Sequence, residues 1–495
     1  MAAAAPWRYG DVMRFLHRWM LAALPLPALL PLACGSSSGS PSMDTDAGAK
    51  DTGSPGHDGS SPEGSTGPET GGPETSVCVP PKGGAPTVAP TASNIKHVVV
   101  IVQENHTFDN YFNYYCTAAT GSKPTCNTGP ACCETGPATD PGFAASPITQ
   151  DDTANGANDP NHDQSCELTE IDNGKMDGYV NGPLGCAATF NFAYANEATV
   201  KPYWDLATSN ALADNYFQSV VGASSSNDMY LATASYVFLD DTYDPVAIGA
   251  SCDLSAAQKD FTNPNIADLL VTASVPWGWF GQGYDAMVAA RSETPPKCPH
   301  DPACPIGGLT IYPCSYDPGD NPFAYFKQYT DNPKYVGDYD QFTCDLTTSA
   351  LPGVTYLKAI GFRSEHPGLG DTISAGEAFV TSTLAAIDAS PYKSDTLVLL
   401  TWDESGGFFD HVAPPAKSTV DKQPYGPRIP LLALGTFAKQ NYISHVQMEH
   451  SSIVKFIEWN WLGGKTGQLG QRDATVNNIG DMLDPTKTGA TVPAD

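Results

Sequence analysis

Short, uninterrupted runs of apolar residues predict the buried strands of a sheet. Three are strong, HVVVIV (97–102), SDTLVLLTW (394–402) and IPLLALG (429–435), and VTYLKAI (354–360) is a weaker fourth. Runs of this length, bounded by polar turns and without polar alternation, are typical of parallel strands covered on both faces. We therefore expect these segments to lie in one mostly parallel sheet.

Segments with helical spacing of apolar residues lie between and after these strands. They are 202–217, 265–273, 375–390 and 450–462. Strands that alternate with helices indicate the α/β class, with a mostly parallel sheet sandwiched by helices. Because ligands of such sheets bind outside the carboxyl ends of the strands, a functional site is expected there.

The N-terminal segment is typical of an export signal. Arg8, Arg14 and Arg18 precede the apolar run at 20–33, which ends at Cys34 and a Ser-rich stretch. The run is too short and too often broken by proline to span a bilayer. The sequence LAC followed by Gly resembles a bacterial lipoprotein processing site, so lipidation of Cys34 is predicted, with ordinary signal cleavage as the alternative.

Composition divides the chain further. Residues 35–92 are rich in Gly, Ser, Thr, Pro and Asp and contain almost no large apolar side chain. Such a segment cannot bury enough surface to offset its ordering entropy, which predicts a disordered tether. We therefore expect a signal segment at 1–34, this tether, one folded domain at 93–485 and a short tail at 486–495.

The charge balance excludes two classes of partner. The chain carries 54 acidic against 25 basic residues, a formal net charge of −29 at pH 7. Nucleic acid and anionic membrane surfaces repel such a chain, so membrane contact is expected only through a lipid anchor on Cys34. The predicted location is the cell envelope, or otherwise the periplasm or the medium. No pattern indicates an oligomeric state.

The cysteines predict structural disulfides. The chain has 13, so 12 remain without Cys34, and an exported protein meets an oxidising compartment. The spacings do not match those of zinc sites, and they do not reveal the pairing. Most cysteines fall in or beside two long aperiodic stretches, 113–165 and 293–345, which we expect to be crosslinked insertions that cover the site.

Two predicted strands end in acidic or amide side chains. Glu104 and Asn105 follow the first strand, and Asp403 and Glu404 follow the strand at 394–402. If these strands are neighbours, three carboxylates meet, and their pKa values rise unless a cation lies between them. Oxygen ligands suit Ca²⁺, Mg²⁺ or Mn²⁺, with Zn²⁺ as a further option. The alternative is that each pair is solvated in its own loop.

The sequence around both pairs resembles a known family. VVIVQENHTFDNYF is similar to the ENrSFD signature of the phosphoesterase family that contains bacterial phospholipases C and acid phosphatases, and WDESGGFFDHVAPP is similar to its DExGGfyDHVxPP signature. The resemblance runs from about residue 94 to 462. Further matching segments, in the family's order, are NDPNHD, NGKMDGYV, LADNYFQSVVGASSSNDMYL, NPFAYF, SEHPG, YGPRIPLLALG and EHSSIVKFIEW.

The resemblance implies an alkaline-phosphatase-like scaffold and hydrolysis of a phosphate ester by a metal-bound hydroxyl. It implies one divalent metal ion (Ca, Mg, Mn, Zn or Fe). Glu104, Asn105 and Asp403 match metal ligands of the family, and Glu404 lies beside them. The substrate would be a small phosphate ester or a phospholipid head group.

The resemblance also implies the reacting groups. Ser224, in GASSSN, matches the nucleophile, and His162 and His366 match histidines that face the phosphoryl group. A free serine hydroxyl is a poor nucleophile at neutral pH, and a bound cation lowers its pKa. A helix beginning at Ser224 would add the positive end of its dipole, and Gly222 permits the turn before it.

Two departures from the family pattern leave alternatives open. Prolines usual in the nucleophile turn are replaced by Ala223 and Ser226, so Ser225 and Ser226 stay alternative nucleophiles. Relatives carry a histidine pair before their Asn-Pro, where this chain has Asp320, and His300 is a candidate substitute.

The predicted function is an exported, metal-dependent phosphoesterase of the phospholipase C or acid phosphatase type, acting on phosphate mono- or diesters. The alternative is a catalytically silent surface lipoprotein that retains the fold for binding. A Ser-His-Asp hydrolase is less consistent with the sequence because GASSSN is not a G-x-S-x-G turn. The aromatic segment 275–284 fits either the core or the mouth of a lipid site, and the core is favoured.

Overall fold

An eight-stranded sheet with one antiparallel strand organises the fold. The computed structural model describes residues 89–252, 257–294 and 297–494, which belong to a single unit. The strand order is β12-β4-β11-β10-β1-β9-β7-β8, and every neighbouring pair is parallel except the two that involve β11. The strands are β1 (His97–Gln103), β4 (Ala211–Ala213), β7 (Trp277–Gly281), β8 (Val336–Asp338), β9 (Val354–Lys358), β10 (Thr396–Trp402), β11 (Leu431–Leu434) and β12 (Tyr442–Ser444).

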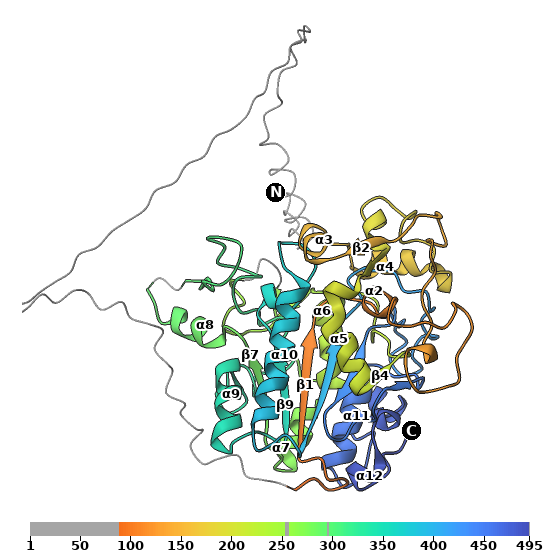
Figure 1. Ribbon diagram of the computed structural model, residues 1–495. Coiled ribbons are helices and arrows are strands. Elements are labelled where there is room, and N and C mark those ends of the chain that lie inside the picture. The colour runs from red at the N-terminus through yellow and green to blue at the C-terminus, as the bar shows by residue number, and fades with distance from the viewer. Residues whose placement is uncertain (1–88, 253–256, 295–296, 495) are drawn as a thin grey trace, which may run out of the picture. The chain divides into compact units, whose positions relative to one another are not determined.

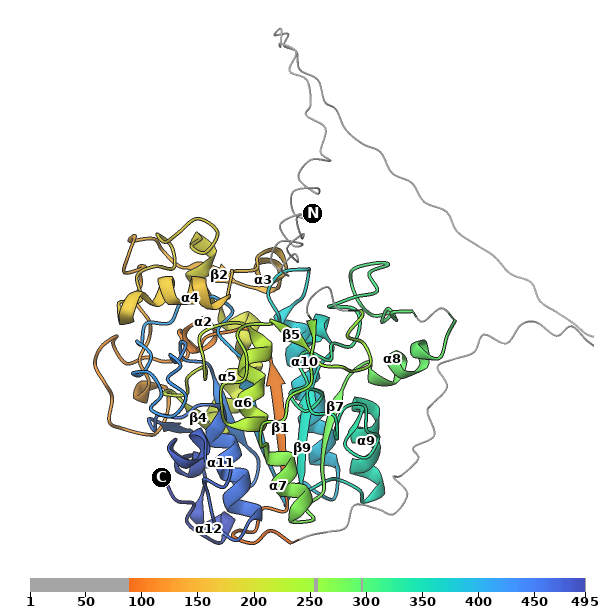
Figure 2. The same ribbon diagram turned by 180° about the vertical axis from the view of Figure 1, so that it is seen from behind.

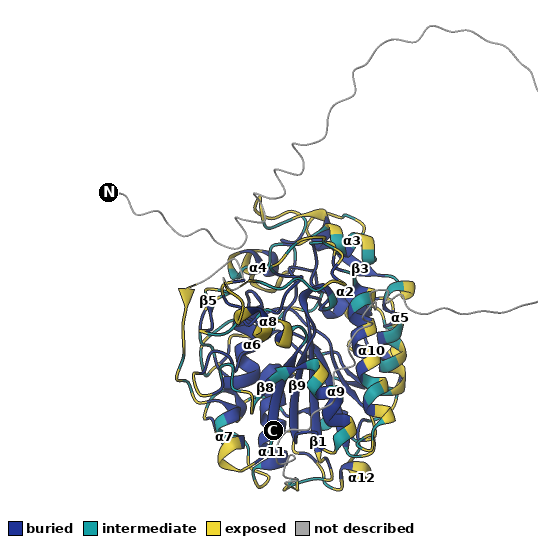
Figure 3. Cartoon of the chain, turned by 90° about the vertical axis from the view of Figure 1, so that its left-hand side faces the viewer, coloured by how far each residue is buried: buried dark blue, intermediate teal, exposed yellow. Residues whose placement is uncertain are grey.

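Helices cover both faces of this sheet, as predicted. Figure 1 shows α5 (Glu197–Ser209) and α10 (Ile373–Ala389) in front of β1, and Figure 2 shows α6 (Ser224–Thr233) and α11 (His450–Trp461) on the opposite face. The alternating side chains of β1 divide between the two layers: Val98, Val100 and Val102 pack with α6 and α11, whereas Val99 and Ile101 pack with α5 and α10. The strands are accordingly buried on both sides, and α6 and α11 are buried along their whole length, whereas α5 and α10 have exposed outer surfaces (Figure 3).

The remaining elements are short and lie mostly in the connections. The helices are α2 (Phe108–Phe112), α3 (Asp152–Ala157), α4 (Gln164–Ile171), α7 (Ile266–Thr272), α8 (Tyr284–Arg291), α9 (Tyr339–Thr348) and α12 (Pro485–Thr488), and the strands are β2 (Ile148–Gln150), β3 (Ala193–Ala195), β5 (Tyr243–Asp244) and β6 (Ala257–Gln258). In Figure 1 the arrow of β1 points toward the end of the fold where α2, α3 and α4 lie.

One predicted strand is antiparallel to its neighbours, whereas the sequence predicted a parallel one. The segment 429–435 was expected to be parallel, but β11 is antiparallel to β10 and to β4. Residues 403–430, which connect β10 to β11, contain no helix. Two parallel neighbours need a crossover, usually helical, so a connection made only of loops favours the antiparallel return.

One predicted helix is too long. The segment 202–217 was expected to be helical throughout, but α5 ends at Ser209 and β4 follows at once. The side chain of Asn210 donates a 3.0 Å hydrogen bond to the carbonyl of Leu206 and so closes the last turn. The residues beyond it pair with β11 and β12, so tertiary pairing overrides the helical pattern.

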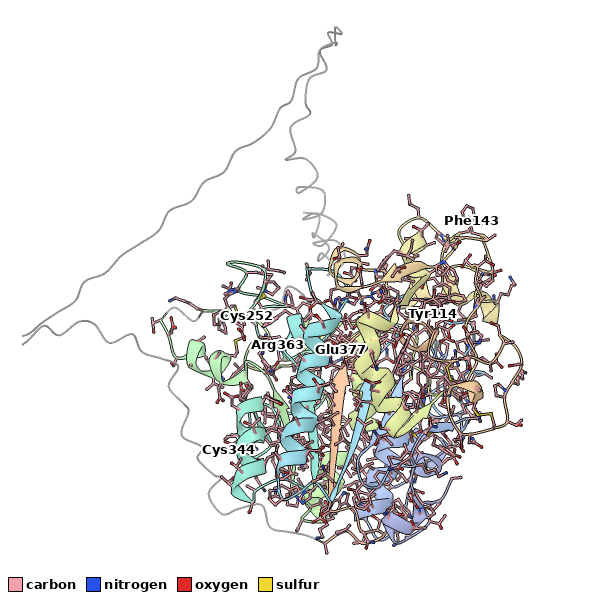
Figure 4. All side chains as sticks on the ribbon, in the orientation of Figure 1. Tyr114, Phe143, Cys252, Cys344, Arg363 and Glu377 are labelled. Atoms are coloured by element: carbon pink, nitrogen blue, oxygen red, sulfur yellow. A yellow bond between two sulfur atoms is a disulfide. The ribbon has the colours of Figure 1, made fainter. Side chains whose placement is uncertain are left out.

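The insertions are crosslinked by disulfides, as predicted. Five pairs join the described cysteines: Cys116–Cys133, Cys126–Cys132, Cys166–Cys186, Cys252–Cys298 and Cys304–Cys314. No pair joins the cysteines of residues 116–186 to those of residues 252–314. Cys252, labelled in Figure 4, packs with Tyr284 and Met287 of α8, so this disulfide ties the second insertion to the edge of the sheet.

The predicted signal segment, Cys34 and most of the predicted tether lie outside the described residues. From Thr91 onward the chain is attached to the domain, because the Thr91 N–H donates a 2.8 Å hydrogen bond to the carbonyl of Asn460. Beyond residue 485, Val492 is buried and the carbonyl of Ala494 accepts from the N–H of Asn478. None of the described helices combines the length and the apolar character needed to cross a bilayer.

Candidate active site

Two acidic pairs lie side by side at the carboxyl ends of β1 and β10. These strands are parallel neighbours in which Gln103 pairs with Trp402, so the next residues of both strands emerge together. Glu104, Asn105, Asp403 and Glu404 are all buried. The structure therefore brings together the four residues that the sequence suggested as metal ligands.

Each of these four residues has one buried side-chain oxygen that accepts no well-aligned hydrogen bond, although the one on Glu104 lies 2.9 Å from the ammonium of Lys358. These atoms are Glu104 Oε1, Asn105 Oδ1, Asp403 Oδ2 and Glu404 Oε1. Burying unsatisfied oxygens is costly, and carboxylate and amide oxygens are the ligands that hard divalent cations take. These four residues could therefore supply oxygen ligands to a divalent ion.

The second oxygen of each carboxylate is held by the protein. The Tyr312 hydroxyl donates to Glu104 Oε2 (2.8 Å), the N–H of Asn105 donates to Asp403 Oδ1 (3.1 Å), and the N–H of Gly406 donates to Glu404 Oε2 (2.7 Å). These bonds fix the orientation of each carboxylate and leave its other oxygen for a ligand.

Gly406, which follows Ser405, packs closely against the backbone of Asn105, and only glycine fits there. Asn105 has φ 65°, and Gly406 also has a positive φ, of 65°. A Cβ on Gly406 would lie 2.2 Å from the carbonyl oxygen of Asn105. Only glycine combines the left-handed conformation with this approach, so it explains the Gly-Gly that follows the acidic pair.

Ser224 begins α6 and faces the same carboxylates. It lines a cavity together with Glu104, His162 and His366. Burial raises the pKa of Asp403, and the positive charge of Lys358, at the end of the next strand but one, partly opposes that rise. The turn before Ser224 needs Gly222, which has φ 127° and where a Cβ would meet Asp240 Oδ1 at 2.4 Å.

The two neighbouring serines differ in what holds them. The Ser226 hydroxyl donates to the carbonyl of Ala223 (2.7 Å), and the N–H of Ser225 donates to Asp241 Oδ1 (2.9 Å). Ser224 and Ser225 both line the cavity, so Ser225 stays an alternative nucleophile, whereas the hydroxyl of Ser226 is already bonded to the backbone.

Both predicted histidines face the cavity through one ring nitrogen. Nδ1 of His162 donates to the carbonyl of Pro160 (2.9 Å), and Nδ1 of His366 donates to that of Pro367 (2.7 Å). These bonds place a proton on Nδ1 of each ring, and Nε2 of His162 lies 3.4 Å from Nδ2 of Asn105, one of the candidate metal ligands. Burial by itself would lower the pKa of His162, but the charges of Glu404 and Asp159 raise it to about 10.

His300 does not replace the missing third histidine. Its Nδ1 contacts the carbonyl of Leu309 within the cysteine-rich insertion, and it is not among the residues that line the cavity.

A buried lysine that the sequence analysis did not single out lies among the acids. Lys358 is the last residue of β9, the strand next to β1. Its Nζ lies 2.9 Å from Glu104 Oε1, 3.8 Å from Asp403 Oδ2 and 3.8 Å from Asp320 Oδ2. Burial alone would raise the pKa of Glu104, but Lys358 and His366 hold it at about 2. The signal in the sequence was a lysine inside an apolar strand, where a buried charge needs partners.

The cysteine-rich insertion forms part of the cavity wall, as expected. Tyr312, Asp317, Gly319 and Asp320 line the cavity from this side. Asp241 and Asp244, which follow α6, line it as well. Four aspartates therefore line the cavity.

A second group of acids and one histidine is neutralised by an arginine. Asp109, Asp410 and His411 lie close enough to share a metal ion. However, Arg428 donates from Nε to Asp410 Oδ1 (2.8 Å) and from Nη2 to Asp109 Oδ1 (2.9 Å), and His411 Nδ1 donates to Asp109 Oδ2 (2.7 Å). The carboxylate charges are already paired, so this cluster braces the loop after Glu404.

The comparison with protein families agrees with the arrangement at these strand ends. The model of the phosphoesterase family matches residues 95–462. The chain belongs to the phosphoesterase family. The match begins just before β1 and ends just after α11, so it includes both strands that carry the acidic pairs and the helix that Ser224 begins.

Relatives within the phosphoesterase family are similar at low identity. The non-hemolytic phospholipase C of Pseudomonas aeruginosa is 24% identical over 323 residues, covering 58% of this chain and 42% of that protein. Phospholipase C B of Mycobacterium tuberculosis is 22% identical over 427 residues, covering 79% of this chain and 77% of that protein. The chain spans about half the length of the first curated relatives it matches.

One solved structure covers a similar share of the chain. It is a protein in the alkaline phosphatase superfamily from Vibrio parahaemolyticus, with 12% identity, a TM-score of 0.33, and coverage of 80% of this chain and 74% of that one. A TM-score this low does not carry an argument of its own.

Proposed function

We propose that the protein is a metal-dependent phosphoesterase that hydrolyses phosphate mono- or diesters with Ser224 as nucleophile. The observation that carries this proposal is the set of buried side-chain oxygens on Asn105, Asp403 and Glu404 that accept no hydrogen bond, beside Glu104 and a serine at a helix N-terminus. Membership of the phosphoesterase family and the phospholipase C relatives support it.

The residues of the chain divide the work of the reaction. A divalent ion, when bound by these four residues, lowers the pKa of a nearby hydroxyl and neutralises phosphate oxygens. Ser224 Oγ gives up its proton to solvent and forms a bond to phosphorus, and the bond from phosphorus to the leaving alkoxide breaks. Nε2 of His162 or His366 supplies the proton that the alkoxide takes up. A water molecule then hydrolyses the phosphoserine and restores the free serine.

The aspartates that line the cavity favour some classes of phosphate ester over others. Asp241, Asp244, Asp317 and Asp320 line the cavity, so an ester with further negative charge on its leaving part is repelled. An ester whose remaining part is neutral or cationic fits better. We further propose that the protein acts outside the cytoplasm, delivered by the predicted export signal, with Cys34 as a lipid anchor.

The test is an assay of the purified full-length protein with and without a chelator. The substrates are p-nitrophenyl phosphate and p-nitrophenyl phosphorylcholine, and the variants are Ser224→Ala and, as a matched control, Ser226→Ala. We expect turnover that the chelator abolishes, a loss of about 1,000-fold or more in Ser224→Ala, and near wild-type rates in Ser226→Ala.

Each other outcome points to a different conclusion. Activity that survives in Ser224→Ala would move the nucleophile to another residue. Turnover of the choline diester but not of the monoester would select the phospholipase type. No turnover of either substrate, together with no bound metal by elemental analysis, would favour a silent surface lipoprotein.

A further inference from the structure

The carboxylates around the proposed metal site outnumber the charges of a single divalent ion. Glu104, Asp403 and Glu404 belong to the site itself, and Asp320 and Asp228 lie close to it. Both carboxylate oxygens of Asp228, one turn into α6, are buried and accept no hydrogen bond. Five buried carboxylates thus gather where one divalent ion supplies two positive charges.

Lys358 is the nearest cation to this group. Its side chain is only 4% exposed, and its Nζ lies within 4.0 Å of three carboxylates on three different segments. Two of these carboxylates, Glu104 and Asp403, are proposed metal ligands. The third, Asp320, occupies the position before Asn-Pro where relatives in the family carry a histidine pair. A neighbouring strand therefore supplies the positive charge that an imidazole would otherwise bring.

We propose that Lys358 is a positioning residue of the metal site, whose ammonium takes the place of a second cation between Glu104, Asp320 and Asp403. This inference rests on the proposed function. The ammonium neutralises part of the acidic cluster, so the protein keeps its fold without metal. The same charge repels a divalent ion on the shared ligands, so Lys358 weakens metal binding and limits the site to one ion.

A purely structural lysine would behave differently. If Lys358 only held the strand ends together, its removal would lower stability equally with and without metal and would loosen the ligands, which weakens metal binding. If its charge competes with the metal, removal destabilises the metal-free protein and tightens metal binding. The two roles thus predict changes in metal affinity of opposite sign.

The experiment measures Mn²⁺ affinity by titration calorimetry and thermal stability in chelator or in saturating Mn²⁺, on full-length protein. The variants are Lys358→Met and Lys358→Gln, which remove the charge, and Lys358→Arg, which keeps it. We expect both neutral variants to bind Mn²⁺ about tenfold or more tightly than wild type, since repulsion between nearby buried cations is strong. We also expect a lower melting temperature in chelator that Mn²⁺ largely restores, and wild-type affinity in the arginine variant.

Lys96→Met is the matched control, because Lys96 forms an exposed ion pair with Asp395 (2.9 Å) at the opposite end of β10. If the neutral variants of Lys358 do not fold, the affinity for Mn²⁺ is measured on Asp320→Asn instead. This variant removes one of the three carboxylates near Lys358, so its ammonium interacts more strongly with Glu104 and Asp403. We then expect Mn²⁺ to bind more weakly than to wild type.

Unchanged or weaker Mn²⁺ binding in both neutral variants, or unchanged binding in Asp320→Asn, overturns the inference while leaving the metal site intact. Wild-type protein that binds no divalent ion overturns the proposed metal site itself, and the role of Lys358 with it.

Discussion

The N–H of Asn105 donates a 3.1 Å hydrogen bond to Oδ1 of Asp403, a residue 298 positions further along the chain. The N–H of Glu404 donates to the same oxygen (2.7 Å). Both donors use one side of the carboxylate, and Oδ2 on the other side accepts no hydrogen bond. Asp403 therefore has two separate roles: one oxygen fixes the geometry of two loops, and the other is available to a cation.

Asp403→Asn should separate these two roles. The amide oxygen can still accept from Asn105 and Glu404, whereas an NH₂ group replaces Oδ2 and is a poor metal ligand. We expect a folded protein whose melting temperature in chelator is close to that of wild type, with metal affinity about tenfold or more weaker and turnover reduced about 100-fold. Elemental analysis, calorimetry and initial rates measure these effects.

Asp395→Asn is the control for that variant. Asp395 lies just before β10, at the other end of the strand from Asp403, and pairs with Lys96 at the surface. Its substitution should change neither metal content nor rate. Full metal content and full activity in Asp403→Asn would place the metal ion, if there is one, elsewhere.

Asp410→Asn should lower the stability of the protein and leave its bound metal in place, the opposite of the result expected for Asp403→Asn. Asp410 accepts from Arg428 Nε (2.8 Å) and is fully buried, and Arg428 also reaches Asp109. Removing one partner of a buried ion pair costs about 3 kcal/mol or more, because the other charge is left uncompensated. We expect a large loss in the free energy of unfolding, measured by urea titration, with bound metal retained.

This variant also decides between the two acidic clusters. Asp109, Asp410 and His411 lie close enough for a metal ion, but Arg428 already neutralises them. Loss of metal in Asp410→Asn without loss in Asp403→Asn would show that the cluster at Arg428 is the metal site after all.

The strands that carry the site could be predicted, because their signal is local. β1 and β10 are continuous apolar runs that stop at acidic residues, and both occur where the sequence placed them. The direction of β11 could not be predicted from its own residues, since it depends on the helix-free connection before it. In the same way, the three residues of β4 are strand only because β11 and β12 lie on either side of them.

Lys358 shows why part of the site was missed. Its side chain reaches Glu104 and Asp403 only because β9 lies next to β1 on the side away from β10. Strand order is a property of the whole chain, which one sequence does not specify. Tyr312 was missed for a related reason: a disulfide-linked insertion with no periodic pattern brings its hydroxyl to Glu104.

Glu365→Gln should destabilise the protein and slow turnover together. The buried carboxylate of Glu365 accepts from Gln103 Nε2 (3.0 Å), Trp402 Nε1 (3.0 Å) and the hydroxyls of Tyr111 (2.8 Å) and Tyr203. Gln103 and Trp402 end the two strands that carry the acidic pairs, and the next residue, His366, lines the cavity. An amide cannot accept from all four donors, so we expect a loss of about 2 kcal/mol in the free energy of unfolding.

Two variants that each remove one tyrosine hydroxyl measure how much the hydrogen bonds to Glu365 contribute to the free energy of unfolding. Tyr203→Phe removes one donor and should cost about 1 kcal/mol, whereas Tyr179→Phe should cost almost nothing, because the buried Tyr179 hydroxyl makes no hydrogen bond. Equal losses in the two tyrosine variants, measured by urea unfolding, would mean that ring packing and not the bonds to Glu365 sets the stability here.

His445→Gln should remove a stabilisation that depends on pH. Nδ1 of His445 donates to Asp214 (2.8 Å) and Nε2 donates to the carbonyl of Cys126 (2.7 Å), so both nitrogens carry protons. The bond to Asp214 raises the pKa of His445 to about 8, above its usual 6.5, although burial opposes the rise. A raised folded-state pKa stabilises the protein fully below pH 6.5, and this stabilisation is lost as the pH rises through 8.

The expected loss in His445→Gln is about 1 kcal/mol at pH 6, since solvent screens a side chain that is 24% exposed, and close to zero at pH 9. Urea unfolding at the two pH values measures it. A loss in His445→Gln of the same size at both pH values would assign the stabilisation to the neutral hydrogen bonds and not to the charge on His445.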